Sequence, residues 1–385
     1  MTKQPGDSLA SKIVYVGALI ILLLIMGACV FVIYGYVNPQ GPVLPSSTPR
    51  PSPAATYTPP PTSWPSPTPT PVASITPTPD SGFYQQDTKV TTGEFEYYYP
   101  GIWDHYIVYD MNDGMKNYSM LYDTSGQQTR QIDSGTVFSY GAISNGQVML
   151  FYPQNGNKIY LYNIKTGDKF LSCTDDNNRR NSITMSDTKL AYYQDIGHYD
   201  TSGNWAPIYA IYVFNMLDGS TADVIDNIPR PIDIKMSGNK LVYTVVNGQE
   251  SDIFLLDLSV QKPTTKKVSV GTGNNNVARI YGNTIVYHSN VDGKDHIYIY
   301  DINTGNRFIP APDGEQWNAD IYGNTVVYDD DRNGNWDIYA YDLNTHNERR
   351  LTNEPHDQRA PVVYGNRIVY TDNRNGYQAL YTMTI

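Results

Sequence analysis

The sequence predicts an all-β fold: a seven-bladed β-propeller of four-stranded antiparallel blades, preceded by one transmembrane helix and a disordered stalk rich in Pro, Thr and Ser. Three observations lead to this prediction. An uncharged apolar segment lies near the N-terminus, most of the 26 prolines follow it, and a tyrosine-rich strand pattern then recurs to the C-terminus. Such local bias divides the chain into regions of different physical character.

The N-terminal apolar segment, residues 13–37, carries no charged side chain and is long enough to span a bilayer as a helix. A cleaved signal peptide has a shorter apolar core and a small-residue cleavage site, so a retained anchor is favoured. Lys3 and Lys12 precede the segment, whereas the next basic residue after it is Arg50. We therefore predict a cytoplasmic tail over residues 1–12 and a single-pass protein of the cell membrane, extracytoplasmic from Asn38 onward.

The predicted stalk covers residues 38–80. Fifteen of the 26 prolines lie between Pro39 and Pro79, many of them in Thr-Pro and Ser-Pro pairs. Proline lacks a backbone donor and fixes φ, so this segment favours extended polyproline II rather than a packed core. At ~3.1 Å per residue, roughly 40 residues can hold a domain on the order of 100 Å from the membrane. We interpret the segment as a spacer.

Copies of one repeat fill the predicted propeller domain, residues 81–385. The clearest copies begin at Ala278, Ala319 and Ala360, and each reads as a strand, a tight Gly-Asn turn, a Val/Ile/Tyr strand, a polar hairpin, a third strand and a weaker fourth strand. The tight turns lie at Asp104-His105, Asn145-Gly146, Asp187-Thr188, Gly238-Asn239, Gly282-Asn283, Gly323-Asn324 and Gly365-Asn366. Their spacings of 41, 42, 51, 44, 41 and 42 residues are typical of four-stranded propeller blades.

The central strands of the repeat are apolar or aromatic on both faces, as in residues 325–328 (TVVY) and 338–341 (IYAY). An antiparallel sheet with one face in water alternates apolar and polar residues instead. Blades packed around a ring cover both faces of each sheet, which explains the tyrosines.

The last copy stops at Ile385 after three strands, which would leave an open sheet edge. Residues 88–96 precede the first copy as residues 349–357 precede the last. We therefore predict that residues 84–91 form the outer strand of the last blade and close the ring.

The pattern Tyr-x-Asp-x-Arg-Asn-Gly followed by an Ile-Tyr or Leu-Tyr strand occurs at residues 328–334 and 370–376. It resembles the TolB-type, WD-like propeller repeats of prokaryotic envelope proteins. The stalk on a single anchor further resembles surface proteins of methanogenic archaea. The resemblance implies a propeller fold and an envelope location. It does not imply a biochemical role, because TolB itself has an additional α/β domain and is soluble.

Catalytic motifs of serine hydrolases, P-loop enzymes and zinc proteases are absent from the sequence, as is Cys-x-x-Cys. The six histidines are scattered, and Cys173 is the only cysteine after the predicted anchor. We therefore expect a protein that is not an enzyme and requires no cofactor.

One hairpin, residues 329–337, offers a candidate calcium site. It reads D-x-D-x-N-G-x-x-D, which places oxygen ligands at alternate positions around a glycine bend, as calcium loops require. The candidate ligands are Asp329, Asp331, Asn333, Asn335 and Asp337. The next blade repeats the hairpin with Thr371 and Ala379 in place of two ligands. The pattern therefore also fits a structural turn of the repeat, and both interpretations remain open.

Ligand binding is expected on the face of the propeller that carries the longer loops. In a four-stranded meander the first and third turns share one face, and the remaining connections, including residues 195–207, share the other. Loop aromatics on a rigid scaffold often bind ligands, so the candidates are Tyr199, Trp205, Trp317 and Trp336. Packing between blades is the alternative for Trp317 and Trp336.

Beyond residue 80 the chain has 24 basic and 36 acidic residues, a net charge of −12, which disfavours nucleic acid as a partner. We expect a monomeric, cell-surface-anchored propeller that acts as an extracytoplasmic binding or protein-interaction module, with surface proteins or glycans as partners. The alternatives are a structural envelope component and a propeller-type polysaccharide lyase or hydrolase. An enzyme would need acids, His or Arg converging at the central channel.

Overall fold

The computed structural model describes residues 87–385, except 136, 154–157, 174–179, 261–262, 272 and 292. The predicted cytoplasmic tail, transmembrane helix and stalk lie outside the described residues. Within the described part of the chain, no helix has the length and apolar character needed to cross a bilayer.

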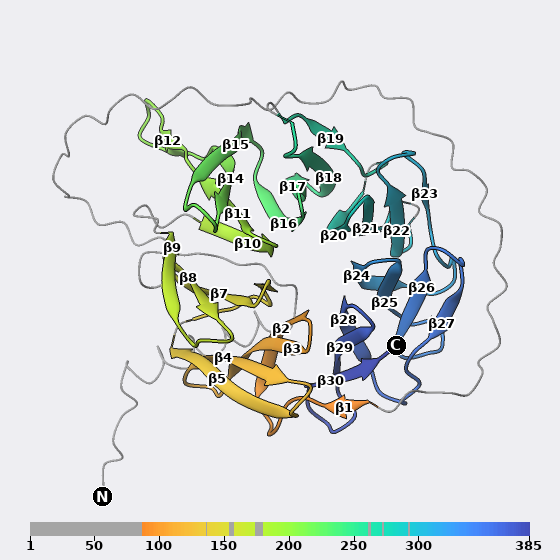
Figure 1. Cartoon of the computed structure of the whole chain (residues 1–385). Helices are drawn as coiled ribbons and strands as arrows, with labels where there is room; N and C mark the ends of the chain where they lie inside the picture. Colours follow the sequence, from red (N-terminus) through yellow and green to blue (C-terminus); the bar gives the residue numbers. More distant parts are fainter. Residues whose placement is uncertain are drawn as a thin grey trace, which may run out of the picture. The chain divides into compact units, whose positions relative to one another are not determined.

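Seven four-stranded antiparallel sheets form the seven blades of a β-propeller, which confirms the predicted fold of this region (Figure 1). Blade 1 contains β2 (Glu96–Trp103), β3 (Tyr106–Asn112), β4 (Asn117–Asp123) and β5 (Gln128–Gly135). Blade 2 contains β6 (Ile143–Ser144), β7 (Gln147–Tyr152), β8 (Lys158–Asn163) and β9 (Lys169–Cys173). Blade 3 contains β10 (Arg180–Ser186), β11 (Lys189–Asp195), β14 (Tyr209–Asn215) and β15 (Thr221–Ile228).

Blade 4 contains β16 (Pro231–Ser237), β17 (Lys240–Asn247), β18 (Glu250–Asp257) and β19 (Thr265–Lys267). Blade 5 contains β20 (Asn275–Tyr281), β21 (Thr284–Ser289), β22 (His296–Asp301) and β23 (Arg307–Phe308). Blade 6 contains β24 (Gln316–Tyr322), β25 (Thr325–Asp330), β26 (Asp337–Asp342) and β27 (Glu348–Arg350). Blade 7 contains β28 (Gln358–Tyr364), β29 (Arg367–Asp372), β30 (Ala379–Thr384) and β1 (Thr88–Lys89).

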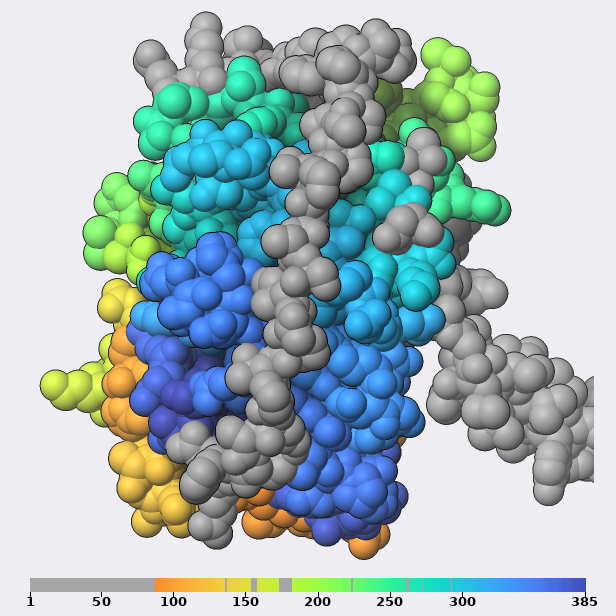
Figure 2. Space-filling view, turned by 90° about the vertical axis from the view of Figure 1, so that its right-hand side faces the viewer, coloured from red at the N-terminus to blue at the C-terminus, as the bar shows by residue number. Residues whose placement is uncertain are grey.

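The hydrophobic cores lie between neighbouring blades rather than within one sheet. The core between blades 5 and 6, for example, joins Val286 and Ile299 to Ile321 and Val326, all of them buried. Each blade packs against a neighbour on both sides. The central strands of a blade are therefore apolar on both faces, as the sequence indicated. Figure 2 shows the last three blades packed side by side.

The tyrosines of the repeat have one recurring place in this packing. Tyr287, Tyr328 and Tyr370 occupy equivalent positions in blades 5, 6 and 7, and all three are completely buried. Each ring stacks on a tyrosine of the next strand, with centroids 5.5 to 6.2 Å apart. Stacked aromatic pairs at this distance stabilise a sheet beyond their buried area.

The ring closes through β1, which pairs antiparallel with β30 as the outer strand of blade 7 (Figure 1). Thr88 faces Thr382, and the amide of Val90 donates to the carbonyl of Leu380 at 2.8 Å. This strand lies within residues 84–91, the segment in which the sequence predicted it. The last blade is thus completed from the opposite end of the described chain, and no open edge remains there.

The innermost strands share a distortion where they line the central channel. Six residues adopt a left-handed backbone with φ between 42° and 52°: Tyr99, Tyr140, Ser182, Val277, Asn318 and Ala360. The strand register shifts beside five of them, in β2, β10, β20, β24 and β28. Bulges of this kind bend a strand and redirect its side chains. Here five of the six residues, and residues that follow them, line the channel.

Candidate binding sites

The predicted long loop of blade 3 folds as a small two-stranded hairpin. Strand β12 (His198–Tyr199) pairs with β13 (Trp205–Ala206), and the hairpin extends outward from the ring (Figure 1). Tyr199 and Trp205 face each other with edge-to-face rings whose centroids are 5.1 Å apart. The structure therefore brings these two predicted site residues together.

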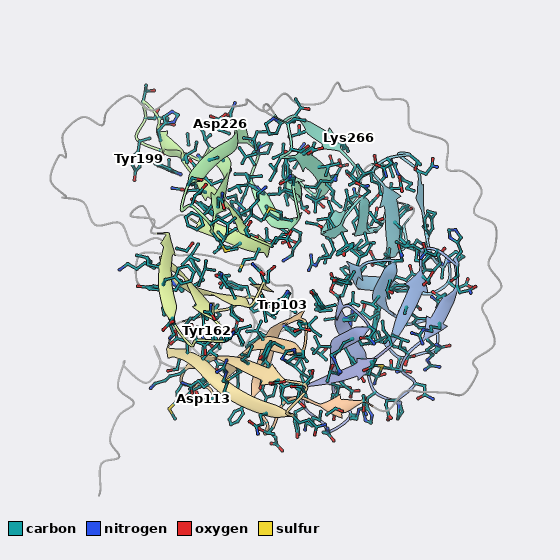
Figure 3. All side chains as sticks on the ribbon, in the orientation of Figure 1. Trp103, Asp113, Tyr162, Tyr199, Asp226 and Lys266 are labelled. Carbon is teal, nitrogen blue, oxygen red and sulfur yellow. The ribbon has the colours of Figure 1, made fainter. Side chains whose placement is uncertain are left out.

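Hydrogen bonds at the base of this hairpin and within its turn hold it in place. The indole N–H of Trp205 donates to Oδ2 of Asp195 at 2.9 Å, and Oδ1 of Asp200 accepts from the amides of Ser202 and Asn204 at 2.8 Å. Trp205 is half-buried, whereas Tyr199 is 69% exposed and lies at the outer end of blade 3 (Figure 3). The hairpin presents one large aromatic side chain to solvent on an ordered support.

Trp317 and Trp336, the other two predicted ligand-binding residues, take part in contacts between blades. Trp317 stacks on His288 of blade 5 with centroids 3.8 Å apart. Trp336 packs against the guanidinium of Arg359 in blade 7, 3.9 Å from the ring centroid. The structure does not place either ring next to Tyr199. These contacts match the alternative of interblade packing, although both rings remain half-buried.

The carboxylates at the two ends of the candidate calcium loop point to different partners. Asp329 is completely buried, and its Oδ2 accepts from Asn318 and from the amide of Ala360, both at 2.9 Å. Asp337 is equally buried and pairs with Arg350 at 2.6 Å.

The other three predicted ligands also have protein partners. Asp331 accepts from the amide of Glu315, Asn333 donates to the hydroxyl of Tyr339, and Asn335 donates to the carbonyls of Glu354 and His356. Nowhere in the described residues do three or more His, Cys, Asp or Glu side chains form a group that could hold a metal ion. The five side chains stabilise the blade 6 hairpin and its contacts with neighbouring segments.

A groove of about 770 Å³ lies between blades 1 and 2, on the face that carries the first and third turns. We call it the blade 1–2 groove. The sequence directed attention to the opposite face because these turns are short. Trp103, His105 and Tyr106 line it from blade 1, and the turns around Gly146 and Lys165 line it from blade 2. In Figure 3, the labelled Trp103 lies near the centre of the ring at this boundary, and the labelled Tyr162 lies farther from the centre.

The central channel holds a second cavity of about 410 Å³, lined by the innermost strands of all seven blades. Its charged residues come from blades 4 to 6. Arg279 lies 3.1 Å from Asp233, with Lys235 and Asp320 beside them on the channel wall. The wall contributed by blades 1 and 2 carries Tyr99 and Tyr140 instead. The channel therefore has a charged side and an aromatic side.

Burial shifts two of the channel groups towards their neutral forms. It lowers the pKa of Lys235, opposed by the carboxylates of Asp233 and Asp320, and it raises the pKa of Asp320, opposed first by Arg279. A less basic amine and a more basic carboxylate are suited to proton transfer when a substrate lies between them. No sequence motif signalled this cluster, because its members come from three repeats and converge only in the ring.

No family model matches the chain, and no curated protein matches its sequence. Among solved structures, an oligogalacturonate lyase in complex with manganese is similar with a TM-score of 0.57 and 14% identity, over 80% of this chain and 94% of that chain. The β-propeller domain of the Trilobed protease from Pyrococcus furiosus, described as having an open velcro topology, gives 0.57 and 12%, over 75% and 95%.

An acylaminoacyl peptidase from Pyrococcus horikoshii is similar with a TM-score of 0.56 and 14% identity, over 72% of this chain and 49% of that chain. The chain thus spans about half the length of that peptidase. At such identities the likeness shows the fold alone, a seven-bladed propeller. In contrast to the open topology described for the Trilobed protease domain, the ring here is closed by β1.

Proposed function

We propose that this protein is a membrane-anchored, extracytoplasmic binding module whose β12–β13 hairpin contacts a protein partner. The observation that carries the proposal is the exposure of Tyr199, 69% on a hairpin that Asp195 and Asp200 hold in place. Exposed tyrosines on rigid supports bury a large area on binding at little cost in conformational entropy, and they are enriched among residues that dominate binding energy.

The location proposed for this module rests on sequence. The uncharged segment 13–37 and the preceding lysines favour a single-pass anchor with the propeller outside the cytoplasm. The likeness to TolB-type repeats and to stalked archaeal surface proteins supports an envelope role of the same kind. Propellers serve many unrelated functions, so the partner has to be identified through the site rather than the fold.

The test is quantitative affinity capture with the full chain in lipid nanodiscs, comparing wild type with Tyr199→Ala and Leu217→Ala. Leu217 is the control because it is an exposed apolar residue of the same blade. We expect wild type and Leu217→Ala to retain the same partner, and Tyr199→Ala to lose it with unchanged thermal stability. Equal capture by all three proteins, or assembly into a layer without a discrete partner, would contradict the proposal.

A second candidate function, a polysaccharide lyase or hydrolase, is favoured by one observation. Lys235, Arg279 and Asp320 line the channel, and Asp233 pairs with Arg279; such an enzyme would need an arrangement of this kind. One structurally similar protein is an oligogalacturonate lyase. Incubation with oligogalacturonate, followed by detection of shortened products, tests this candidate. Activity lost in Lys235→Met would support it, and absence of products would contradict oligogalacturonate as a substrate.

A further inference from the structure

We propose that the blade 1–2 groove binds a neutral oligosaccharide. This inference deepens the proposed role as a binding module, on which it rests, but it concerns a different surface from the β12–β13 hairpin and a different class of ligand. Three features carry it: the interruption of a ring of contacts between blades, a set of aromatic rings in the groove, and a balanced set of charged groups around them.

Five of the seven blade boundaries carry a recurring contact at the end of the inner strand, and the boundary that holds the groove is not among them. At the end of the inner strand, three blades carry a serine whose hydroxyl accepts a hydrogen bond from the first turn of the next blade. The pairs are Ser144 with Asp187, Ser186 with Gly238 and Ser237 with Gly282, at 2.9 to 3.1 Å. Short polar side chains thus keep three of the boundaries closed on this face.

Blades 5 to 7 close the same position with tyrosines. Tyr281 contacts Tyr322 with ring centroids 4.7 Å apart, and Tyr322 contacts Tyr364 at 4.4 Å. Blade 1 carries Trp103 at this position, next to a glycine rather than another ring. A Cβ built on Gly146 would lie 3.8 Å from the Trp103 ring, which is ordinary contact distance. No serine bond or ring pair spans this boundary within the described residues. Arg130 of blade 1 donates to the carbonyl of Ile164 of blade 2 at 2.6 Å instead, and the groove lies beside this bond.

Aromatic rings form one wall of the groove. Trp103 and Tyr106 face each other across the first turn of blade 1, and the ring of His105 lies 4.1 Å from that of Tyr106. All three are half-buried, so each has part of its surface in contact with solvent. Such rings combine an apolar face with a polar edge. A pyranose offers the complementary surface, since its axial C–H groups form an apolar patch and its hydroxyls project around the rim.

The charged groups around the rings balance. Asp104 and Asp123 supply two carboxylates, while Arg130 and Lys165 supply a guanidinium and an ammonium. A charged ligand of either sign would be attracted by two of these side chains and repelled by the other two. Hydroxyl groups both donate and accept hydrogen bonds, so a neutral polyol can pair with groups of either charge, including the atoms that contacts within the protein leave available. The net charge of −12 beyond residue 80 further disfavours phosphate-rich ligands.

The position of the groove also disfavours an extended peptide. Peptides commonly add to a free strand edge, where backbone groups pair with the new strand. The groove is lined by turns and strand ends at Asp104, Asn145 and Lys165, and it therefore offers side chains rather than an edge. Its volume of about 770 Å³ falls within the range of about 300–1,000 Å³ for small-ligand sites.

The test is saturation-transfer NMR on the full chain in nanodiscs, so that no glycoside detergent competes. The probes are linear tetrasaccharides of glucose, galactose, mannose and N-acetylglucosamine. We expect transfer to at least one of them, and a loss of affinity of about tenfold, equivalent to about 1.4 kcal/mol, in Trp103→Ala. Tyr281→Ala is the matched control because Tyr281 occupies the same place in blade 5 and is 37% exposed.

A second variant guards against misfolding of Trp103→Ala. Thr166 is exposed in a turn on the opposite wall, so Thr166→Trp should fold normally and block the groove, abolishing transfer. The inference is overturned if none of the four probes shows transfer, or if transfer persists in both groove variants. Absence of transfer from the wild-type protein, with Tyr199-dependent protein capture intact, would remove this inference alone. Loss of capture in Tyr199→Ala with transfer intact is expected if the two sites act independently.

Discussion

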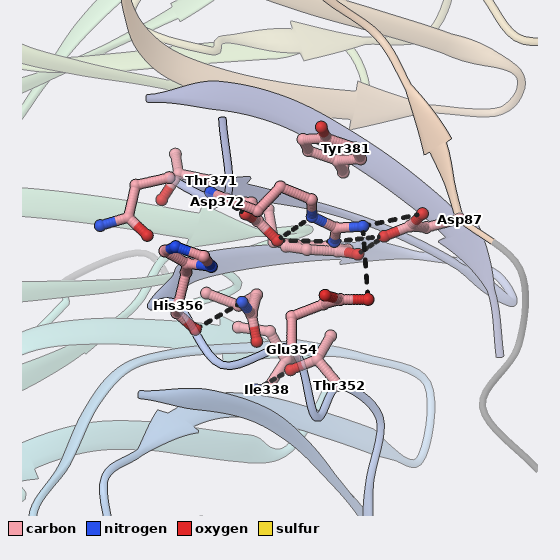
Figure 4. Close-up of polar contacts among 12 residues, drawn as sticks. Asp87, Ile338, Thr352, Glu354, His356, Thr371, Asp372 and Tyr381 are labelled. Atoms are coloured by element: carbon pink, nitrogen blue, oxygen red, sulfur yellow. Dashed lines mark hydrogen bonds and ion pairs between the residues drawn. The ribbon is translucent and has the colours of Figure 1, made fainter. Parts of the chain in front are cut away.

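Nη2 of Arg374 lies 2.6 Å from Oδ2 of Asp87, a residue 287 positions earlier in the chain (Figure 4). The hydroxyl of Tyr370 donates to the same carboxylate at 2.5 Å. In blade 6, Arg332 and Tyr328 make the corresponding contacts with Glu348. Asp87 therefore supplies, from the other end of the described chain, the carboxylate that the fourth strand supplies in a continuous blade.

This equivalence predicts that Asp87→Ala weakens ring closure. The variant leaves Arg374 and Tyr370 without a partner that both use, and the loss of hydrogen bonds to charged groups should lower the free energy of unfolding by about 1 to 3 kcal/mol. Urea unfolding of the full chain in nanodiscs measures the change. Hydrogen exchange should also show loss of protection at the amides of Val90 and Leu380, which join β1 to β30.

Glu348→Ala is the matched control for the contacts that Asp87 makes with blade 7. It removes the same contacts in blade 6, where β27 remains covalently connected to β26 by a short turn. We expect a similar loss of stability with β27 still protected from exchange. Equal protection of β1 in Asp87→Ala and wild type would show that strand pairing alone closes the ring.

Two glycines where blades 1 and 2 meet at the channel give a second prediction. A Cβ on Gly101 would lie 1.9 Å from the carbonyl oxygen of Gly141, a distance that no side chain tolerates. Gly101→Ala must therefore separate the two inner strands, and we expect it to cost about 3 kcal/mol or more, the upper range for overpacked sites. Gly126→Ala is the control, because its Cβ would meet only the Gln128 side chain, at 3.9 Å. Thermal unfolding compares them, and equal stabilities would contradict the close approach.

The architecture could be predicted from the sequence because its signals repeat. The tight turns recur with similar spacing, and strands such as residues 325–328 are apolar on both faces, which only a ring of blades explains. The closing strand could be predicted because the last copy of the repeat has only three strands and would leave an open sheet edge. The bulges at Tyr99, Val277 and Asn318 could not be predicted in this way, since neither β-branching nor aromaticity signals a left-handed backbone.

The sites were harder to predict because they depend on which repeats become neighbours in space. Trp103 and Tyr281 occupy equivalent strand positions, but Trp103 lines the blade 1–2 groove, whereas the ring of Tyr281 contacts Tyr322 of the next blade. Tyr199 could be singled out because the insertion around it breaks the repeat. The environment of Trp336 could not be predicted from its own repeat, because its ring packs against Arg359 of the next blade.

The hairpin at residues 329–337 provides a third prediction. Arg350 and the amide of Ala360 occupy one oxygen each of Asp337 and Asp329, and the latter also accepts from Asn318. The other oxygen of each carboxylate is buried without a hydrogen-bond partner, but within the described residues no group of three His, Cys, Asp or Glu side chains could hold a metal ion. We therefore expect the same melting temperature with Ca²⁺ and with EDTA. A ligand that binds the folded state raises the melting temperature by mass action. An increase with Ca²⁺ that EDTA reverses would establish the calcium loop instead.

Asp110 provides the last prediction, a specific dependence of stability on pH. This carboxylate is 1% exposed in blade 1 and accepts from the amides of Ser139 and Tyr140 and from the hydroxyl of Ser119. Burial raises its pKa to about 6, and these hydrogen bonds only partly offset the shift. Between the unfolded value of 3.8 and the folded one, the folded state holds a proton that the unfolded state has lost. Stability from this group is therefore present below about pH 4 and declines as the pH rises to about 6.

The size of the effect follows from the shift, on the order of 3 kcal/mol between pH 4 and pH 7. We expect the difference in unfolding free energy between wild type and Asp110→Asn to fall by that amount as the pH rises, measured by urea unfolding at each pH. Asp113→Asn is the control. A hydrogen bond from Tyr118 is the main cause that lowers the pKa of Asp113, so its contribution to stability builds up only below the unfolded value of 3.8 and is constant between pH 4 and pH 7. A difference for Asp110 that is flat with pH would show that these donors keep this carboxylate ionised, and that charge at the blade 1–2 connection is part of the native fold.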